Sequence, residues 1–470
     1  MLSIRHLTKT NTIIAAALLC MSMVWNTQAF AVSQKVSEYT LSNGMKVLVK
    51  EDHRAPVIVV QVWYKVGSNR EPNGITGISH VLEHMMFQGT PKHPKGQFSK
   101  LVAQNGGKEN AFTSADFTTY FQKLTSDKLA FALRLEADRM RNLLLDSNAF
   151  AKEIEVVKEE RRMRYDDKPQ SLLYEKLNAM ANVASPYHHL TIGWMSDLQN
   201  MTNDDIKAWY KKFYAPNNAI LVVVGDVKPE EVLRLANETF GALEKSNIPA
   251  YKPHNEAQNL GLRQIDLKIP AKLPAIYLAY NVPSLKTAKD RSDAFALEII
   301  ANLLSGGQSS RLIKNIVRGQ NLATSAGAYF PLYSRFSGLL LLSAVPNKGV
   351  STEKLQQALL AEVNKLKTKL VSDKELSKIK NQIIAQQVYK RDSMFGAAME
   401  IGMLETIGLS WREDETFAKN IRAVTPEQIQ NTAKKFLTEN RLSIARLHPQ
   451  PIKPGTKKQR AKPVSGSRHH

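Results

Sequence analysis

The sequence repeats one pattern of residues at a constant distance of 223 positions. The pattern is a Thr, an Ile, a Lys-Lys-Phe triplet and an Asn, at Thr202, Ile206, 211–213 and Asn217 and again at Thr425, Ile429, 434–436 and Asn440. In each copy the Thr is suited to cap an amphipathic helix that leads into an apolar strand. A constant offset between matching places in two halves is typical of an internal duplication. The chain of 470 residues is therefore expected to contain two similar domains.

Each half mixes strand and helix patterns. In the first half, apolar runs at 56–66 and 217–227 predict strands, Asn43-Gly44 predicts a hairpin turn, and apolar residues at three-four spacing predict helices from Ser126 and Asn148. The second half repeats this order, with strands at 265–269 and 275–282, helices in 293–317, a hairpin over 323–345 and long helices to about 436. The expected fold class is α+β, with two homologous domains that are each a mostly antiparallel sheet covered by helices.

The segment between the two halves lacks a regular pattern. Residues 246–261 contain two prolines and several Asn residues, which are typical of a linker. We therefore expect an N-terminal domain at 32–245, a linker at 246–262 and a C-terminal domain at 263–450.

The first 31 residues have the three parts of a secretory signal peptide. Arg5 and Lys9 precede an apolar run at 13–25, and Ala29-Phe30-Ala31 is a small-residue cleavage site. The apolar run is shorter than the roughly 20 residues of a membrane-spanning helix, which argues against a stable transmembrane anchor. A lipoprotein would use Cys20, but Leu18-Leu19 stand where a small residue is expected. The sequence thus predicts export with cleavage after Ala31, most simply to the periplasm.

Composition limits the chemistry and the partners. Cys20 is the one cysteine, so the mature chain has none, and any metal must bind through His, Asp or Glu. The net charge of +21 would suit nucleic acid, but residues 451–470 contribute six Lys and Arg residues without an acid, and we find no nucleic-acid motif. We read 451–470 as a basic, flexible tail that could contact anionic lipid or cell-wall polymers.

The sequence His80-Val81-Leu82-Glu83-His84 carries the strongest chemical signal. It lies in an apolar segment, 78–87, that is expected to form a buried helix. On a helix, His80 and His84 are one turn apart on the same face, with Glu83 beside them. Two imidazoles at this spacing can bind zinc, and the carboxylate can reach a water molecule at the metal. The alternative is a pair of packed core histidines, but three buried polar groups each need a partner.

A third protein ligand is expected on the helix that starts at Asn148. Glu153 and Glu160 are seven residues apart and fall on its apolar side with Phe150, Ile154, Val156, Val157 and Met163. A carboxylate on such a face is costly unless it is paired or binds a metal. The alternative is a buried salt bridge to Arg161 or Arg164.

These residues resemble the motifs of the pitrilysin/insulinase (inverzincin) metallopeptidases, and the bacterial branch similar to mitochondrial processing peptidase looks closest. The family motif is HxxEH followed far downstream by a Glu that closes an E-x6-E pair, as Glu153 and Glu160 do here. The segments NGMKVLV, NGGKENAFTSADFTTYF, SPYHHLTIGWMSDLQNMT and LLSGGQSSRL resemble family segments in the family's order.

The resemblance implies roles for individual residues. It implies that one Zn2+ per chain is held by His80, His84 and Glu160, that Glu83 is the general base, and that Glu153 is a second carboxylate that orients a ligand. It also implies that Asn110, Ala111 and Phe112 lie on an edge strand that binds the substrate as an added strand. The alternative for this strand is a plain hairpin. His53, His93, His188 and His189 lack ligand spacing, and we expect them to be structural.

The sequence departs from the family in its second half. Many members carry an Arg and, six residues later, a Tyr that hold the substrate carbonyl; here Arg318 is present, but Thr324 replaces the Tyr. A threonine is too short to reach as far as a phenol. Two readings stay open. Either a similar-sized homologous partner without HxxEH completes a heterodimer, or the chain forms a homodimer in which Tyr329 or Tyr333 replaces the phenol.

The resemblance implies a secreted zinc endopeptidase with a clam-like pair of domains that admits short or unfolded peptides. The alternative function is that of a non-catalytic, peptide-binding or partner subunit of a peptidase complex. The intact HxxEH favours the enzyme.

Overall fold

The computed structural model describes residues 36–252, 256–257 and 261–452. The predicted signal peptide and most of the basic tail lie outside these residues. From Ser37 onward the described residues belong to one compact unit, and Val36 belongs to a separate N-terminal unit. None of the helices in the described ranges is both long and apolar enough to cross a lipid bilayer.

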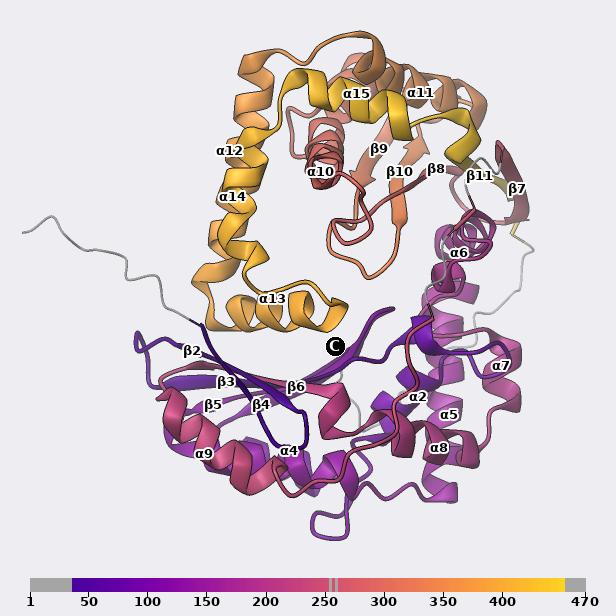
Figure 1. Cartoon of the computed structure of the whole chain (residues 1–470). Helices are drawn as coiled ribbons and strands as arrows, with labels where there is room; N and C mark the ends of the chain where they lie inside the picture. Colours follow the sequence, from indigo (N-terminus) through magenta and orange to yellow (C-terminus); the bar gives the residue numbers. More distant parts are fainter. Residues whose placement is uncertain (1–35, 253–255, 258–260, 453–470) are drawn as a thin grey trace, which may run out of the picture. The chain divides into compact units, whose positions relative to one another are not determined.

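The first half builds a six-stranded sheet (Figure 1). Its strands are β1 (Val36–Thr40), β2 (Lys46–Glu51), β3 (Val57–Tyr64), β4 (Lys108–Thr113), β5 (Thr118–Thr125) and β6 (Ala219–Gly225), in the spatial order β1-β2-β6-β3-β5-β4. Strand β2 pairs with β6 in parallel, whereas β6, β3, β5 and β4 pair antiparallel in succession. Every residue of β6 is buried, as its continuous apolar run predicts for a central strand.

The helices of the first half contain the ligand candidates. They are α2 (Ile78–Met85), α3 (Gln97–Gln104), α4 (Leu129–Arg141), α5 (Ser147–Arg161), α6 (Pro169–Ala181), α7 (Met195–Asn200), α8 (Asn203–Phe213) and α9 (Pro229–Phe240). Shorter turns are η1 (Ser68–Arg70), η2 (Ser126–Lys128), η3 (Arg162–Asp166), η4 (Pro186–His188) and η5 (Pro216–Asn218). Helices α4 and α9 lie along one face of the sheet in Figure 1, and their apolar residues share its core.

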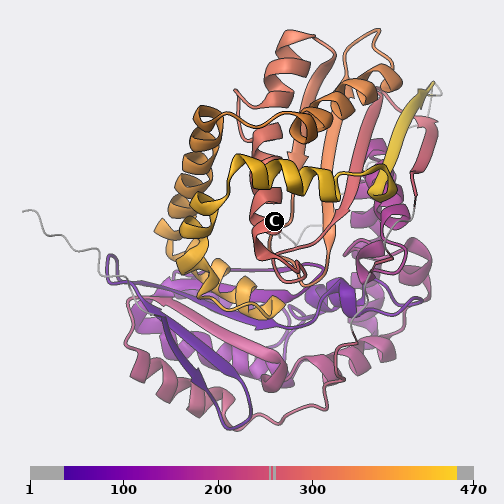
Figure 2. The same cartoon turned by 45° about the horizontal axis from the view of Figure 1, so that its top comes forward.

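The second half builds a five-stranded sheet. Its strands are β7 (Arg263–Pro270), β8 (Ala275–Val282), β9 (Ala323–Tyr329), β10 (Gly338–Pro346) and β11 (Leu442–Gln450), in the order β7-β11-β8-β10-β9. Its helices are α10 (Arg291–Ser305), α11 (Thr352–Thr368), α12 (Asp373–Asp392), α13 (Met394–Ile407), α14 (Glu413–Ala423) and α15 (Pro426–Phe436), with the π-helix η6 (Leu312–Gly319) and the short 3-10 helix η7 (Glu439–Arg441). Figure 2 shows these helices from a second direction.

The two halves share one topology, which confirms the predicted duplication. The order β2-β6-β3-β5-β4 corresponds strand by strand to β7-β11-β8-β10-β9, and each order includes one parallel pair, β2 with β6 and β7 with β11. Thr202 and Thr425, at the constant offset, both form a complete capping box at the start of α8 and α15. The expected α+β class with two mostly antiparallel sheets therefore holds, whereas the domain limits 32–245 and 263–450 stay a prediction.

Each half also packs a helix against the sheet of the other half. Helix α6, from the first half, buries Leu173, Leu177 and Ala181 against β8, β10 and β11. Helix α13, from the second half, packs against β3 and β6. There Gly402 lies so close to the indole of Trp63 that a Cβ would be 2.1 Å from Trp63 Cε2. The division of the sequence into two halves at the linker did not predict this exchange of helices between the two halves.

One local expectation was wrong. We expected Met163 on the apolar side of the helix from Asn148, but it is 50% exposed. Helix α5 ends at Arg161 and continues as the π-helical turn η3, whose wider spacing changes the face on which the next residues lie. The position seven residues after Ile154 is taken by Arg161, which is buried.

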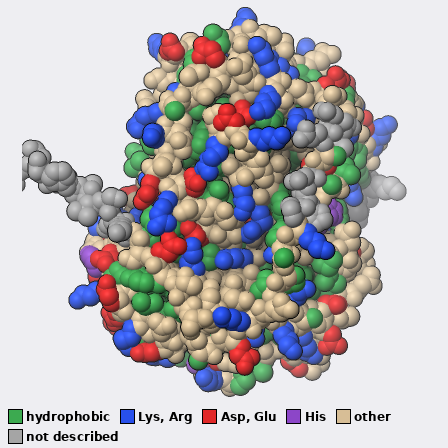
Figure 3. Space-filling view, in the orientation of Figure 1, with side chains coloured by type: hydrophobic (Ala, Val, Ile, Leu, Met, Phe, Trp, Pro, Cys, Tyr) green, Lys and Arg blue, Asp and Glu red, His purple; other side chains and the backbone are tan. Residues whose placement is uncertain are grey.

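Charged side chains of both signs are interspersed over the face of the molecule in Figure 3.

Candidate metal centre

Helix α2 presents the two histidines. Its residues Ile78, Val81, Leu82 and Met85 are fully buried, so the helix is held in the first-half core. The imidazoles of His80 and His84 lie on the same face, with ring centroids 4.9 Å apart. This is the arrangement that the i, i+4 spacing predicts.

Helix α5 packs against α2 and presents the two glutamates. Asp146 caps its N-terminus by accepting hydrogen bonds from the backbone N–H groups of Asn148 and Ala149. Phe150, Ile154 and Val157 anchor the helix in the core, while the side chains of Glu153 and Glu160 are each 17% exposed. Both carboxylates point to the histidines of α2.

Three donor atoms converge on one point. His80 Nε2 lies 3.6 Å from Glu160 Oε2, and His84 Nε2 lies 3.5 Å from the same oxygen. All three donor atoms are within 4.8 Å of one another. A tetrahedral zinc ion with ligand distances of about 2.0–2.1 Å separates its ligand atoms by about 3.3–3.4 Å, close to these spacings. Two imidazoles and a carboxylate, without cysteine, thus fit a catalytic zinc site and could hold the metal.

Neighbouring side chains restrain the two glutamates. Glu160 Oε1 forms a 2.9 Å salt bridge with Arg164, which leaves Oε2 for the histidines. Glu153 Oε2 lies 3.6 Å from His84 Nδ1, and its Oε1 accepts a 2.8 Å hydrogen bond from Gln88. A carboxylate at the second nitrogen of a metal-binding imidazole is a common way to fix the ring and its tautomer.

Glu83 lies beside this cluster and is bound by the edge strand. Its Oε2 accepts a hydrogen bond from Thr113 Oγ1, at the end of β4. The sequence did not predict the contact of Thr113 with Glu83 or that of Gln88 with Glu153. Thr113 lies in the family-like segment at 105–121, which was the available signal, whereas nothing in the sequence distinguished Gln88.

The surroundings of the two histidines shift their pKa values in opposite directions. Burial and then the positive charge of His84 lower the pKa of His80 to about 3. Burial would also lower the pKa of His84, but its contacts with Glu153 and Glu160 raise it to about 9. Without a metal, His84 therefore carries the proton that balances the carboxylates, and His80 is neutral.

The pKa values of the carboxylates Glu160 and Glu83 also shift in opposite directions. Burial acts to raise the pKa of Glu160, but the neighbouring histidines and Arg164 lower it to about 2. Burial raises the pKa of Glu83 above its ordinary value, although the hydrogen bond from Thr113 opposes this shift. Glu160 is thus an anion at neutral pH, while Glu83 is the more basic carboxylate, as a proton acceptor should be.

The expected substrate strand is an edge strand. β4 ends the first sheet, and its one sheet neighbour, among the described strands, is β5. Asn110, Ala111 and Phe112 pair with Phe121, Tyr120 and Thr119 of β5. No described strand pairs with the opposite edge of β4, and Thr113 connects β4 to Glu83 by a hydrogen bond.

The second-half candidates lie on η6 and in the β9–β10 hairpin. Arg318 is exposed at the end of η6, donates a hydrogen bond to Gln308, and has no hydrogen bond or ion pair with the described residues of the cluster. Thr324 is exposed on β9 and donates to the carbonyl oxygen of Val345 at 3.3 Å. The hydroxyl of Tyr333 is buried without a hydrogen-bond partner in the described residues, and its ring lies 6.5 Å from that of Phe417 in the second-half core. This leaves Tyr329 as the local candidate for a phenol.

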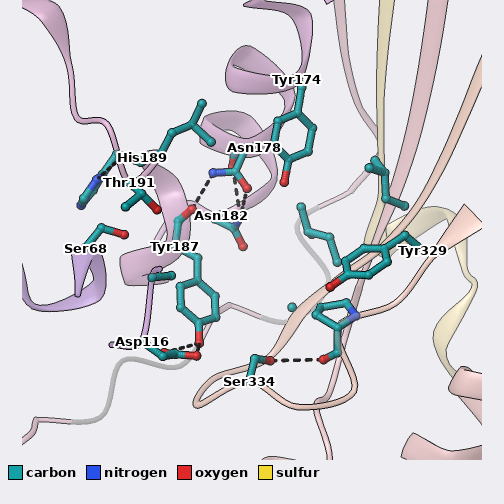
Figure 4. Close-up of a pocket in the computed structure, with 16 residues that line it drawn as sticks. Ser68, Asp116, Tyr174, Asn178, Asn182, Tyr187, His189, Thr191, Tyr329 and Ser334 are labelled. Atoms are coloured by element: carbon teal, nitrogen blue, oxygen red, sulfur yellow. Dashed lines mark hydrogen bonds between the residues drawn. The ribbon is translucent and has the colours of Figure 1, made fainter. Parts of the chain in front are cut away.

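Tyr329 lines a cavity of ≈ 260 Å³ between α6, the 182–191 segment and the β9–β10 hairpin (Figure 4). Figure 4 shows the rings of Tyr174 and Tyr329 entering it from α6 and β9. Asp116 also lines the cavity, but its carboxylate accepts hydrogen bonds from Tyr187 at 2.7 and 2.8 Å and from the backbone N–H of Arg335 at 3.1 Å. The cavity therefore offers aromatic and neutral polar groups, because its one carboxylate is already satisfied.

Known proteins share this fold. The family model "Insulinase (Peptidase family M16)" matches residues 46–193, and "Peptidase M16 inactive domain" matches residues 200–383. The zinc protease PqqE of Helicobacter pylori is 37% identical over 350 residues, which are 74% of this chain and 78% of that protein. The crystal structure of a protease from Helicobacter pylori has a TM-score of 0.83 and 32% identity, and the match covers 88% of this chain and 100% of that one.

A more distant relative is a probable mitochondrial-processing peptidase subunit beta of Arabidopsis thaliana. It is 26% identical over 425 residues, which are 87% of this chain and 78% of the plant protein. Fold and matches together define a two-domain chain whose named relatives include zinc proteases. The chain belongs to the insulinase family, peptidase family M16.

Proposed function

We propose that this protein is a zinc-dependent endopeptidase that hydrolyses short or unfolded peptides, with one zinc ion per chain held by His80, His84 and Glu160. The observation that carries the proposal is the convergence of both Nε2 atoms on Glu160 Oε2, at 3.6 and 3.5 Å, beside the buried carboxylate of Glu83. The zinc protease names of the relatives support the same metal and reaction.

The chain's own residues perform the proton transfers. Bound zinc supplies Lewis acidity, which makes water a stronger acid and a peptide carbonyl a better electrophile. Glu83 accepts the proton of the attacking water and passes it to the leaving amine. Thr113 holds one oxygen of Glu83 and thereby directs the other. Glu153 orients His84 through Nδ1, and Arg164 holds Glu160 so that only Oε2 faces the metal position.

The substrate binds to β4 as an added strand. Backbone groups along Asn110, Ala111 and Phe112 provide hydrogen bonds that do not depend on the peptide sequence. An unfolded peptide can present such a strand, whereas a folded protein has already paired its own. Thr113, at the end of the same strand, connects the bound peptide to Glu83.

Two substitutions test the assignment. Glu83→Gln should retain zinc at parental stoichiometry and lose about 10²–10⁴-fold in turnover, because only the proton acceptor is removed. Glu160→Gln should weaken zinc binding itself, because a neutral amide replaces an anionic ligand. Zinc content by metal analysis and hydrolysis of an unstructured peptide are the two measurements. Parental activity of Glu83→Gln would overturn the mechanism, and a purified parent that binds no zinc would favour the non-catalytic peptide-binding alternative.

The location follows from residues 1–31. We propose export and cleavage after Ala31, with the mature enzyme in the periplasm. N-terminal sequencing of the mature protein should therefore begin at Val32. A mature protein that still begins at Met1 would contradict this location.

A further inference from the structure

The segment at 190–201, within the family-like stretch SPYHHLTIGWMSDLQNMT, has no role in the proposed reaction. In the structure it passes beside the turn that leads into the histidine helix α2. Its contacts form one connected path between α2 and α5.

The path begins at the N-terminus of α2. The side chain of Glu71 is fully buried and accepts hydrogen bonds from the backbone N–H groups of Gly77, at 2.6 Å, and Ser79, at 2.8 Å. These are donors of the first helical turn, which have no partners within the helix. Glu71 therefore sets where α2 begins, and Ser79 directly precedes His80.

Asp197, on α7, holds the preceding turn. Its Oδ2 accepts hydrogen bonds from the N–H of Gly74 at 3.1 Å, the N–H of Thr76 at 3.1 Å and Thr76 Oγ1 at 2.6 Å. Thr76 Oγ1 in turn accepts a 2.9 Å hydrogen bond from the N–H of Trp194. The turn before α2 thus both donates hydrogen bonds to the 190–201 segment and accepts one from it.

The two backbones also touch. A Cβ at Gly77 would lie 2.5 Å from the carbonyl oxygen of Ile192, and a Cβ at Gly193 would lie 2.2 Å from the carbonyl oxygen of Thr76. Both glycines have positive φ, 90° and 78°. Only glycine satisfies both the approach and the conformation, so the distance between these two segments is fixed by backbone contact.

Arg161 completes the path to α5. It directly follows the ligand candidate Glu160 and is 4% exposed. Its Nη1 donates to the carbonyl oxygen of Gly193 at 2.7 Å, and the guanidinium forms a two-point pair with Glu175 at 2.8 and 3.1 Å. Arg161 thereby ties the end of α5 to the glycine that contacts the turn before α2.

We infer that Arg161 and Thr76, acting through the Gly193 turn and Asp197, are positioning residues that set the separation of α2 and α5 and so hold His80, His84 and Glu160 at metal-binding distance. The inference rests on the proposed zinc site. None of these positioning residues contacts the metal position, so their effect is on ligand geometry. Residues that orient metal ligands in this way change metal affinity by about 10–100-fold when they are lost.

The test uses two conservative substitutions in the full mature chain. Arg161→Lys keeps the charge but loses the two-point geometry. Thr76→Val keeps the shape but removes the hydroxyl between Asp197 and Trp194. For each metal-free protein, zinc affinity is measured by competition with a chromophoric chelator, and Co2+ is added to record the visible absorption spectrum. Circular dichroism verifies that each protein is folded.

Matched controls separate ligand positioning from loss of stability. Arg311→Lys disrupts a two-point pair with Glu375, at 2.9 and 2.7 Å, in the second half. Thr432→Val removes a buried hydroxyl that donates to Asp293 at 3.0 Å. These controls should lower the melting temperature and leave zinc affinity within about twofold of the parent value.

We expect Arg161→Lys and Thr76→Val to weaken zinc binding by about 10–100-fold and to alter the intensity of the Co2+ bands. Parental zinc affinity and an unchanged Co2+ spectrum in both folded variants would overturn the inference. If Arg161→Lys does not fold, Thr76→Val decides. A parent protein that binds neither metal would overturn the proposed function instead, so the two failures are distinguishable.

Discussion

At the scale of single residues, the hydrogen bond from Thr113 to Glu83 connects β4, the proposed substrate strand, to the proposed proton acceptor. Thr113→Val removes the hydroxyl and keeps the shape, so we expect kcat to fall by about 10–100-fold with zinc content unchanged. Thr113→Ser keeps the donor and should retain most of the parental kcat. Steady-state hydrolysis of an unstructured peptide measures both. Equal loss in both variants would indicate a packing role for the side chain.

The proton on His84 predicts how zinc affinity depends on pH. Because the pKa of His84 is about 9 without metal, the ring is protonated at pH 7 and must lose that proton to bind zinc. Affinity should therefore rise by about tenfold per pH unit between pH 7 and 8 and level off above pH 9. Calorimetry in buffers of different ionisation enthalpy should show release of about one proton per zinc at pH 7. A binding heat that is independent of the buffer would contradict this.

At the scale of elements, α6 of the first half packs on the sheet of the second half, and α13 of the second half packs on the sheet of the first half. Gly402 of α13 is where this packing is tightest, since a Cβ would lie 2.1 Å from Trp63 Cε2. Replacing glycine by alanine within a helix usually stabilises it by about 1 kcal/mol. Here the added methyl overpacks a buried contact, which typically costs about 1–3 kcal/mol.

We therefore expect Gly402→Ala to lower the free energy of unfolding, as measured by urea titration. In a Trp63→Phe background the smaller ring should relieve the contact, and the cost of Gly402→Ala should shrink. Stabilisation by Gly402→Ala in the parent would show that α13 does not pack against Trp63 as described.

At the scale of the whole molecule, the proposed mechanism requires a group that complements Glu83 at the substrate carbonyl. Thr324 stands where the resemblance to the family implies a tyrosine, and it donates to the carbonyl oxygen of Val345 within its own hairpin. We propose that a homologous subunit that lacks HxxEH supplies the missing phenol. The competing arrangement is a homodimer that uses Tyr329, the tyrosine that lines the cavity beside α6.

Peptide hydrolysis by the isolated chain and by its mixture with the candidate subunit distinguishes these arrangements. The heterodimer predicts an increase of about 10²–10³-fold on mixing at matched zinc occupancy, the usual effect of one oxyanion donor. It also predicts no change for Tyr329→Phe. Full activity of the isolated chain, lost in Tyr329→Phe, would support the homodimer and refute the partner.

The sequence alone determined much of the framework. The 223-residue repeat predicted two equivalent halves, and the capping boxes at Thr202 and Thr425 confirm it. The apolar run at 275–282 predicted β8 with its observed bounds. The spacing of His80 and His84 placed both rings on one helix face, because helix geometry is set by neighbouring residues. The roles of Glu83, Glu153 and Glu160 stay predictions, but the carboxylates of Glu153 and Glu160 do lie beside the rings of His80 and His84.

Only the tertiary structure decided the rest, because contacts between residues far apart in sequence depend on how the elements pack. The pattern of α5 did not show that a π turn after Arg161 would expose Met163. Nor could periodicity show that Arg161 is bound to Gly193 rather than to a glutamate of its own helix. The sequence also did not predict that α6 and α13 each pack on the sheet of the other half, since an apolar helix face does not specify which sheet it covers.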